Sequence, residues 1–194
     1  MGRLVGDLLD FSAIDSGTLR LVRDWCRLDL VLDAARQCVA GAPPLVVELC
    51  HAPDLPAVWA DHDRLEQVFV NLIDNAVRHA HGVRQIAVTS TLDPGERTVT
   101  VRVSDDGRGI GEEFLERVFL PRERGATEDA GAGLGLAIAR GIVEAHGGTI
   151  CIEPTREGTT VAVTIPVEHS DFDERRDGFE AAMVDADGAS ADIG

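Results

Sequence analysis

Residues 65–76 read LEQVFVNLIDNA and predict a long helix with one buried face. The apolar residues recur at the three- and four-residue spacing of a helix; they are Leu65, Val68, Phe69, Leu72, Ile73 and Ala76. Asp61 or Asp63 can cap this helix, and Asp63 with Glu66 also has the spacing of a capping box. We expect the helix to run to about His79.

The same helix carries a polar stripe beside its apolar face. Gln67, Asn71, Asn75 and Arg78 follow one another at steps of four, four and three residues, and therefore share one side. Carboxamide oxygens are hard ligands of the kind that Mg²⁺ accepts, and a guanidinium can contact phosphate. An ordinary solvated helix face has the same composition, so this stripe alone does not define a site.

The rest of the chain predicts an α/β (α+β) order, with a mixed sheet covered by helices on one face. Upstream, we expect a helix over 1–19 ended by Gly17, a strand over 19–25, a helix over 28–39 and strands over 45–50 and 57–60. Downstream, we expect strands over 84–92 and 97–104 joined by a type II turn, and a short helix near 111–117. A helix over 134–146, ended by Gly147 and capped by His146, precedes strands over 149–153 and 159–165.

Composition narrows the possible chemistry. The chain has 194 residues, 44% of them hydrophobic, which allows one good core and a short appendage. A net charge of −16 argues against nucleic acid or an anionic membrane surface as a general partner. All 18 basic residues are arginine, so a P-loop lysine and a Schiff-base lysine are both excluded.

Cysteine usage and the chain ends indicate the compartment. The four cysteines show no CxxC spacing and are expected to be buried or idle thiols in a reducing cytoplasm. No apolar run is long enough to cross a bilayer, and no signal peptide is evident. We therefore expect a cytoplasmic location, either free or as the cytoplasmic part of a membrane-associated sensor. The acidic stretch over 167–194 is expected to be disordered.

A second motif, SDDGRGIG, covers residues 104–111 at the end of a predicted strand. The carboxylate of Asp105 could accept a hydrogen bond from an amino group such as that of adenine. Gly107 and Gly109 would let the backbone approach a flat ring closely. A simple Asp-Gly turn would have the same sequence, so this motif is weak by itself.

A third motif, GAGLGL, covers residues 131–136 and opens directly into a helix. Unpaired N–H groups at a helix start form an anion site when glycines admit close approach. A dinucleotide-binding fingerprint is excluded, because that motif is GxGxxG directly after a strand. A glycine-rich loop without a ligand remains an alternative. A fourth stretch, REGTT over 156–160, is by itself only a turn.

The order of these four elements is more specific than any one of them. It resembles the N, G1, G2 and G3 boxes of the ATP-binding domain of sensor histidine kinases, in the superfamily of gyrase, Hsp90 and MutL. The resemblance covers about residues 20–166, and AHGG at 145–148 is similar to the family stretch that ends the helix after G2. It implies a Bergerat-type ATP-binding fold, a two-layer sandwich, with ATP and Mg²⁺ as ligands.

The resemblance implies roles for residues of the long helix. Asn75 would coordinate Mg²⁺, Asn71 would lie near the phosphates in the catalytic centre, and Arg78 could contact phosphate. His79 would lie near the nucleotide. In gyrase-like relatives a glutamate that activates water stands at the position of Asn71. Because asparagine cannot take a proton, phosphotransfer is favoured over simple hydrolysis.

The resemblance also implies the rest of the pocket. Asp105 would receive the adenine amino group, Thr159 would close the far side, and Arg124 could reach the γ-phosphate. The residues that shape the pocket and the ATP lid would be Gly107, Gly109, Ile110, Gly131, Gly133, Leu134, Gly135 and Leu136. The family often reads Phe-x-Pro-Phe-Tyr-Arg before the lid, where residues 119–124 here read FLPRER, so we expect the packing of the lid to differ from the family pattern.

The start of the chain resembles the end of the second helix of the family's dimerisation domain. We therefore expect a dimerisation-helix remnant over 1–19, the ATP-binding domain over 20–166 and the acidic tail over 167–194. None of the six histidines stands in a His-Glu or His-Asp helical context before a proline. The phosphate-accepting histidine is thus expected on dimerisation helices outside this chain, in trans or upstream.

The leading hypothesis is the catalytic domain of a two-component sensor histidine kinase, serving a response regulator. A stand-alone serine/threonine kinase of the anti-sigma-factor type would have the same fold, but the dimerisation-helix remnant argues against it. A nucleotide-binding regulatory module without catalysis is a third reading, allowed by the altered residues before the lid. A ligandless globular domain would require four ordered motifs to coincide by chance.

Overall fold

The computed structural model describes residues 2–39, 46–52, 55–79, 85–93, 95, 97–107, 109–111, 114–115, 117–121, 133–155 and 157–167. Helix α3 (His62–His79) is the central helix. Asp61 is its cap, because its Oδ1 accepts the backbone N–H of Arg64 at 3.1 Å. Because the helix begins at His62 and Asp61 caps it, Asp63 lies inside its first turn, and the predicted capping box of Asp63 with Glu66 is wrong. The predicted apolar face is buried, including Leu65, Val68, Phe69, Leu72, Ile73 and Ala76.

The main sheet has five strands in the order β2-β4-β5-β7-β6. β2 (Val46–His51) pairs with β4 (Gln85–Asp93) in parallel. The other three pairs are antiparallel and join β4 to β5 (Thr98–Asp105), β5 to β7 (Thr159–Pro166) and β7 to β6 (Thr149–Glu153). The sheet is therefore mixed, as predicted, and the β5–β7 register places Asp105 opposite Thr159.

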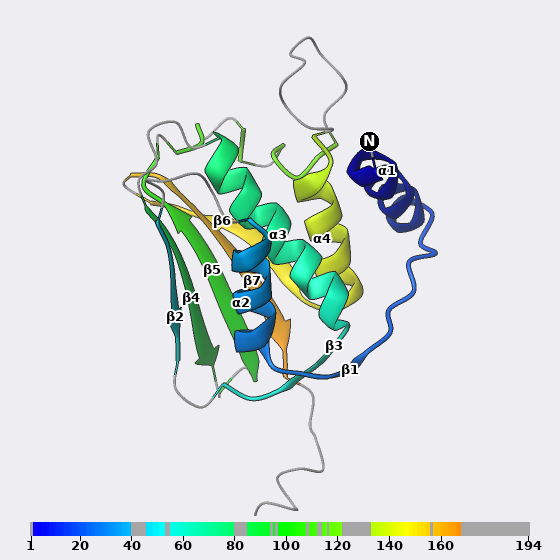
Figure 1. Ribbon diagram of the computed structural model, residues 1–194, viewed down its shortest axis with the longest axis horizontal. Coiled ribbons are helices and arrows are strands. Elements are labelled where there is room, and N and C mark those ends of the chain that lie inside the picture. Colours follow the sequence, from blue (N-terminus) through cyan, green and yellow to red (C-terminus); the bar gives the residue numbers. More distant parts are fainter. Residues whose placement is uncertain are drawn as a thin grey trace, which may run out of the picture.

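Three helices form a second layer on one face of this sheet (Figure 1). They are α2 (Leu28–Cys38), α3 and α4 (Gly135–Ala145). The core between the layers contains fully buried side chains from both, such as Phe69, Ile138, Val101 and Val163. The predicted fold class, a two-layer α/β sandwich with helices on one face, is confirmed.

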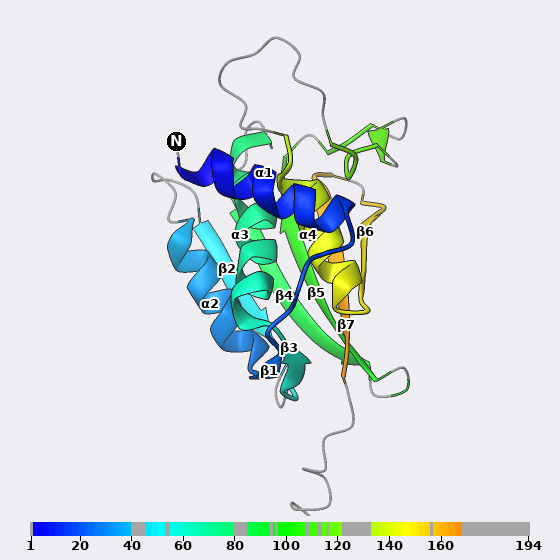
Figure 2. The same ribbon diagram turned by 90° about the vertical axis from the view of Figure 1, so that its right-hand side faces the viewer.

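Helix α1 (Gly2–Asp15) lies outside this sandwich, against the outer surface of α3 and α4 (Figure 2). It ends earlier than the predicted residue 19, because the chain turns at Gly17, where φ is 66°. Leu4, Val5, Leu8 and Leu9 on this helix are exposed. Only part of its apolar surface thus packs against the sandwich.

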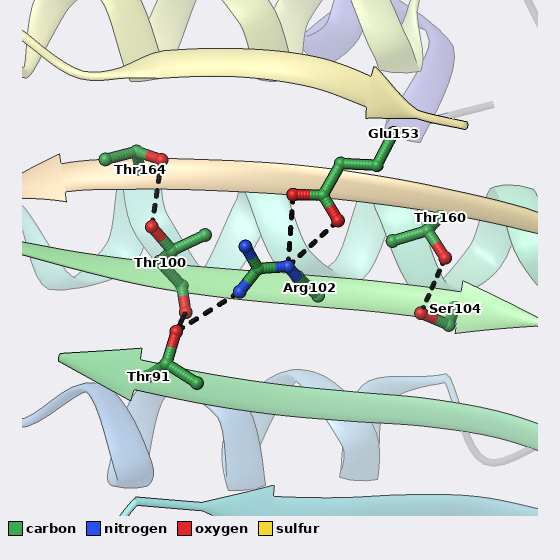
Figure 3. A network of polar contacts seen from close by, with 7 residues as sticks. All are labelled: Thr91, Thr100, Arg102, Ser104, Glu153, Thr160 and Thr164. Carbon is green, nitrogen blue, oxygen red and sulfur yellow. Dashed lines mark hydrogen bonds and ion pairs between the residues drawn. The ribbon is translucent and has the colours of Figure 1, made fainter. Parts of the chain in front are cut away.

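The opposite face of the sheet carries a network of polar side chains (Figure 3). The helices α2, α3 and α4 all lie on the other face (Figure 1). Arg102 donates from Nε to both carboxylate oxygens of Glu153, at 3.1 and 2.9 Å. Hydroxyl pairs bridge neighbouring strands at Thr100 and Thr164, 3.1 Å apart, and at Ser104 and Thr160, 2.9 Å apart. Because these groups satisfy one another, this face of the sheet needs no covering layer.

A separate two-stranded sheet joins β1 (Asp24–Cys26) to β3 (Val58–Ala60). Trp25 faces Trp59 across it, with ring centroids 5.3 Å apart. The strand predicted over 19–25 is therefore wrong in extent, since residues 19–23 form no ladder. Their polar groups bond elsewhere, for example from the N–H of Val22 to Asp61.

Some predictions concern residues that the structure describes only in part or not at all. Residues 122–132 and 168–194, Pro94 and Glu96 of the turn after β4, and part of the helix expected near 111–117 lie outside the described residues. Around that last helix, Phe114 N–H donates to Gly111 and Arg117 N–H donates to Phe114, which is one short helical turn. None of the helices in the described ranges is long and apolar enough to span a membrane.

Candidate functional site

Asp105 is the last residue of β5, and its carboxylate is held in place by two backbone groups. Oδ1 accepts the N–H of Gly107 at 2.9 Å and the N–H of Thr159 at 3.3 Å. The first bond closes the turn after β5, and the second joins that turn to the start of β7. The residue is half-buried, and within the described residues the second oxygen, Oδ2, accepts no hydrogen bond.

Two glycines bring the backbone of this corner into close contact. Gly109 has φ 75° and Gly158 has φ 72°, both in the left-handed region that favours glycine. A β-carbon on Gly109 would lie 2.7 Å from the carbonyl oxygen of Gly158, and one on Gly158 would overlap the carbonyl of Asp105. Gly109 and the end of β5 at Asp105 thus pack tightly against Gly158 and form one corner.

A second contact links α3 to the start of α4. The buried side chain of Asn71 donates from Nδ2 to the carbonyl oxygen of Gly135 at 3.2 Å. The carboxamide of the predicted N box therefore meets the helix that the glycine-rich motif opens. The side chain of Leu134 is buried in the core, and Leu136 is half-buried and packs against that core. Gly133, with φ 67°, is the exposed residue just before this helix.

The rest of the polar stripe on α3 has mixed surroundings. Asn75 is half-buried one turn after Asn71, and the described residues offer its side chain no hydrogen-bond partner. Arg78 is exposed and donates from Nε to Asp74 at 2.8 Å. Gln67 faces α1, where its Nε2 donates to Asp10 at 2.7 Å. Within the stripe, Gln67 therefore contacts α1 and Asn71 contacts the start of α4.

Other predicted site residues fall outside what the structure describes. Arg124 and Gly131 are among the residues left out, and nothing is described of the side chain of His79. Gly107 and Ile110 are half-buried next to the Asp105 corner. The structure thus brings together two clusters, one at Asp105 and Thr159 and one at Asn71 and Gly135.

Two polar clusters near the helices were missed by the sequence analysis. Arg64 donates to Asp10 at 2.8 Å and to Gln67 at 2.9 Å, which closes a ring of polar contacts between α1 and α3. His146, expected only as a helix cap, also accepts the backbone N–H of Asp61 at 3.0 Å. Both clusters join residues far apart in sequence, so no local pattern could have indicated them.

Comparison with known proteins gives the same class that the fold and the site define. The family described as histidine kinase-, DNA gyrase B- and HSP90-like ATPase matches residues 60–169. The chain is 34% identical over 189 residues, 92% of its length, to the non-motile and phage-resistance protein of Caulobacter vibrioides. It is 35% identical over 84% of its length to the sensor protein KdpD of Escherichia coli. It spans only 22% and 18% of these two relatives.

Solved structures agree with the sequence relatives. The histidine kinase AdeS of Acinetobacter baumannii matches with a TM-score of 0.72 and 26% identity, over 87% of this chain and 79% of that one. ShkA in complex with AMPPNP matches with a TM-score of 0.73 and 25% identity, over 87% of this chain and 36% of that one. The chain belongs to the histidine kinase-, gyrase- and HSP90-like ATPase family, and its predicted resemblance to sensor histidine kinase ATP-binding domains is confirmed.

Proposed function

We propose that this chain is the ATP-binding catalytic domain of a two-component sensor histidine kinase. Its reaction would transfer the γ-phosphoryl group of ATP to a histidine that is not in this chain. The observation that carries the proposal is the Asp105 carboxylate, fixed by the N–H groups of Gly107 and Thr159 with Oδ2 left over. A carboxylate held in this way can accept one hydrogen bond from the adenine amino group with little reorganisation.

The two clusters indicate the direction in which the nucleotide would lie in the proposed site. The adenine would lie at Asp105, with Gly107, Gly109, Ile110 and Thr159 around it. The phosphates would lie toward the start of α4, at Gly133 and Gly135, because the first backbone N–H groups of a helix have no partner within it. Asn71 meets this helix start at the carbonyl of Gly135. Leu136 supports this helix from the core side. Gly131 and Arg124 complete the proposed lid outside the described residues.

The residues present fit a magnesium ion that arrives with the nucleotide. In the described part of the chain, no group of three or more His, Cys, Asp or Glu side chains is arranged to hold a metal. Mg²⁺ usually keeps several waters and takes few protein ligands in phosphate sites, so one carboxamide from Asn75 suffices. Bound there, the ion would neutralise charge on the phosphates.

The protein's own contribution to phosphoryl transfer would be positioning and charge neutralisation. Asn71 cannot act as a general base, which favours transfer over hydrolysis. Arg78 would have to leave Asp74 to reach a phosphate, and Arg124 would approach from the lid. The acceptor would lie on dimerisation helices, in trans or upstream, and a response-regulator aspartate would receive the phosphoryl group next.

We also propose, on the same basis, that the chain divides into a dimerisation-helix remnant over 1–19, the ATP-binding domain over 20–166 and an acidic tail over 167–194. The proposed location is cytoplasmic.

The adenine assignment is tested by Asp105→Asn. The amide oxygen can still accept the N–H groups of Gly107 and Thr159, but the new NH₂ group meets the adenine amino group as donor against donor. We expect ATP affinity in calorimetry to fall by about tenfold to a hundredfold, with thermal stability nearly unchanged. Asp63→Asn, which removes the same charge from an exposed position, is the control. Unchanged affinity in Asp105→Asn would remove the adenine site from Asp105.

The reaction is tested by transfer of radiolabelled γ-phosphate from Mg-ATP. The chain is assayed alone, with a histidine-bearing helical fragment, and in a form extended upstream. Acid-labile label that requires a histidine helix supports the kinase. Acid-stable label on serine or threonine would favour the anti-sigma-factor type of kinase. ATP binding without transfer in any mixture would indicate a non-catalytic nucleotide-binding module.

A further inference from the structure

His146, at the end of α4, has both ring nitrogens in defined contacts. The side chain is buried, with 4% of its surface exposed. Nδ1 lies 2.8 Å from the carbonyl oxygen of Ile142, and Nε2 accepts the backbone N–H of Asp61 at 3.0 Å. A carbonyl can only accept and a backbone N–H can only donate, so Nδ1 carries a proton and Nε2 carries none. These contacts require a neutral imidazole in one tautomer.

Asp61 is the point where three segments meet. Its Oδ2 accepts the N–H of Val22 at 2.7 Å, and its Oδ1 accepts the N–H of Arg64 at 3.1 Å. One residue further, Arg23 donates from Nη2 to the carbonyl of Ala145 at 2.8 Å. The segment that leads from α1, the first turn of α3 and the last turn of α4 are therefore joined at one place. We call the contacts of Val22, Arg23, Asp61 and His146 the junction.

The charged groups that face the imidazole have opposite effects on it. Burial is the largest effect and lowers the pKa of His146 from its usual 6.5, and the guanidinium of Arg23 lowers it further. The carbonyl of Ile142 and the carboxylate of Asp61 act in the other direction. The balance keeps the ring neutral while the junction is closed.

We propose that the protonation state of His146 controls whether the segment after α1 is fixed to the ATP-binding domain. The neutral ring closes the junction. A proton on Nε2 would point a second N–H at the N–H of Asp61, which breaks that bond and leaves a charge buried beside Arg23. The junction then opens, and the segment after α1 is released from the first turn of α3 and the last turn of α4. This property requires no nucleotide and is independent of the proposed kinase activity.

The coupling between protonation of His146 and opening of the junction has a definite sign and size. In the open junction the ring is solvated and titrates near its usual value, whereas the closed junction resists the proton. The opening equilibrium is therefore independent of pH above about 6.5 and rises by up to about tenfold per pH unit below it, until the closed form itself binds the proton. Opening is favoured as pH falls.

Hydrogen exchange measures this opening directly. Exchange rates of peptides over 19–26 and 58–66 are recorded from about pH 5 to about pH 8 and divided by the intrinsic rate at each pH. Trp25 and Trp59, whose rings contact each other at a tilt of 59°, are the only tryptophans of the chain and border the junction, so fluorescence gives a second readout. We expect corrected exchange in both peptides to rise toward acid, with a matching fluorescence change.

Two variants and one control distinguish an effect of protonation at His146 from a general destabilisation of the fold by acid. His146→Gln offers an amide oxygen for the N–H of Asp61 and cannot titrate, so its corrected exchange is expected to be flat over this pH range. His146→Phe has no acceptor and is expected to be open at every pH. His62→Gln removes an exposed histidine from the first turn of α3 and should behave like the wild type.

The wild type and His146→Gln alone decide the proposal if His146→Phe does not fold. A pH-independent wild type would overturn it. An acid-induced rise in His146→Gln as large as in the wild type would overturn it as well, because the proton would then act at another group.

Discussion

The α-carbon of Gly158 packs against the carbonyl group of Asp105, so closely that a β-carbon on Gly158 would overlap the carbonyl oxygen. The neighbouring Thr159 N–H then donates to the Asp105 carboxylate. The turn before β7 therefore positions the side chain at the end of β5. The glycine, which by sequence was only part of a turn, is a structural requirement of the proposed adenine site.

Gly158→Ala is expected to lower both stability and ATP affinity. The left-handed backbone alone costs an alanine about 1–2 kcal/mol, and the overlap with Asp105 forces the corner apart as well. Thermal unfolding and calorimetric titration measure the two effects. Gly6→Ala is the control, because a β-carbon there meets nothing and alanine favours the helix. Wild-type stability and affinity in Gly158→Ala would show that the corner does not position Asp105.

Gly135→Ala is expected to separate folding from binding. A β-carbon at Gly135 would lie 3.6 Å from the Asn71 side chain, an ordinary contact, and alanine is a better helix former than glycine. We expect stability to be unchanged or raised by up to about 1 kcal/mol. If phosphates approach this helix start, the added methyl group lowers ATP affinity. Equal affinity in variant and wild type would place the phosphates elsewhere.

Asn71 and Asn75 should respond differently to substitution. Asn71→Asp replaces a buried donor by a carboxylate that faces the carbonyl of Gly135, and we expect a loss of about 1–3 kcal/mol in urea unfolding. Asn75→Ala removes no side-chain hydrogen bond within the described residues, and should change stability by less than about 0.5 kcal/mol. It should instead weaken the Mg²⁺ dependence of ATP binding. The reverse pattern would exchange the structural and metal roles of the two residues.

The parts of the site that could be predicted from the sequence are those with local periodicity. The apolar face of α3 and the alternation of β5 place Asn71 and Asp105, because spacing within one element determines which side chains share a face. Spacing cannot determine what lies opposite that face. Gln67 shares the stripe of Asn71 but bonds to Asp10, which is 57 residues away. Asp61 and His146 are 85 residues apart. Only tertiary packing brings these groups together.

Asp10→Ala is expected to loosen α1. Asp10 accepts bonds from Arg64 at 2.8 Å and from Gln67 at 2.7 Å, and these bonds join α1 to α3. A helix of 14 residues is marginal on its own in water, so α1 depends on this contact. We expect amide exchange in α1 to rise by about tenfold, with the core of α3 unchanged.

The matched control for α1 is Asp15→Asn. Asp15 is exposed in the last turn of the same helix, where a negative charge is unfavourable, so its removal should leave exchange unchanged or slower. Equal exchange in Asp10→Ala and Asp15→Asn would mean that Ile14, which packs onto Gly141 of α4, is sufficient to dock the helix.

Thiol alkylation should distinguish the four cysteines, which the sequence analysis treated alike. Cys26 is buried, and burial followed by the charges of Asp61 and Asp24 raises its pKa to about 11. Cys38, Cys50 and Cys151 are exposed, but Cys38 donates to Glu66 at 3.4 Å, and this bond raises its pKa. Because the thiolate is the reactive form, Cys50 and Cys151 should be alkylated first at about pH 8, then Cys38, with Cys26 protected.

Mass spectrometry of iodoacetamide-treated chain measures this order, and denatured chain, in which all four cysteines react, is the control. Raising the pH should accelerate Cys38 before Cys26, because deprotonation of Cys26 is opposed by burial and by two carboxylates. Cys26 lies in β1 beside the junction, paired with Val58. Opening of the junction should therefore expose it, and His146→Phe should label faster at Cys26 than the wild type. Labelling of Cys26 in the folded wild type as fast as Cys151 would contradict the buried environment on which this prediction rests.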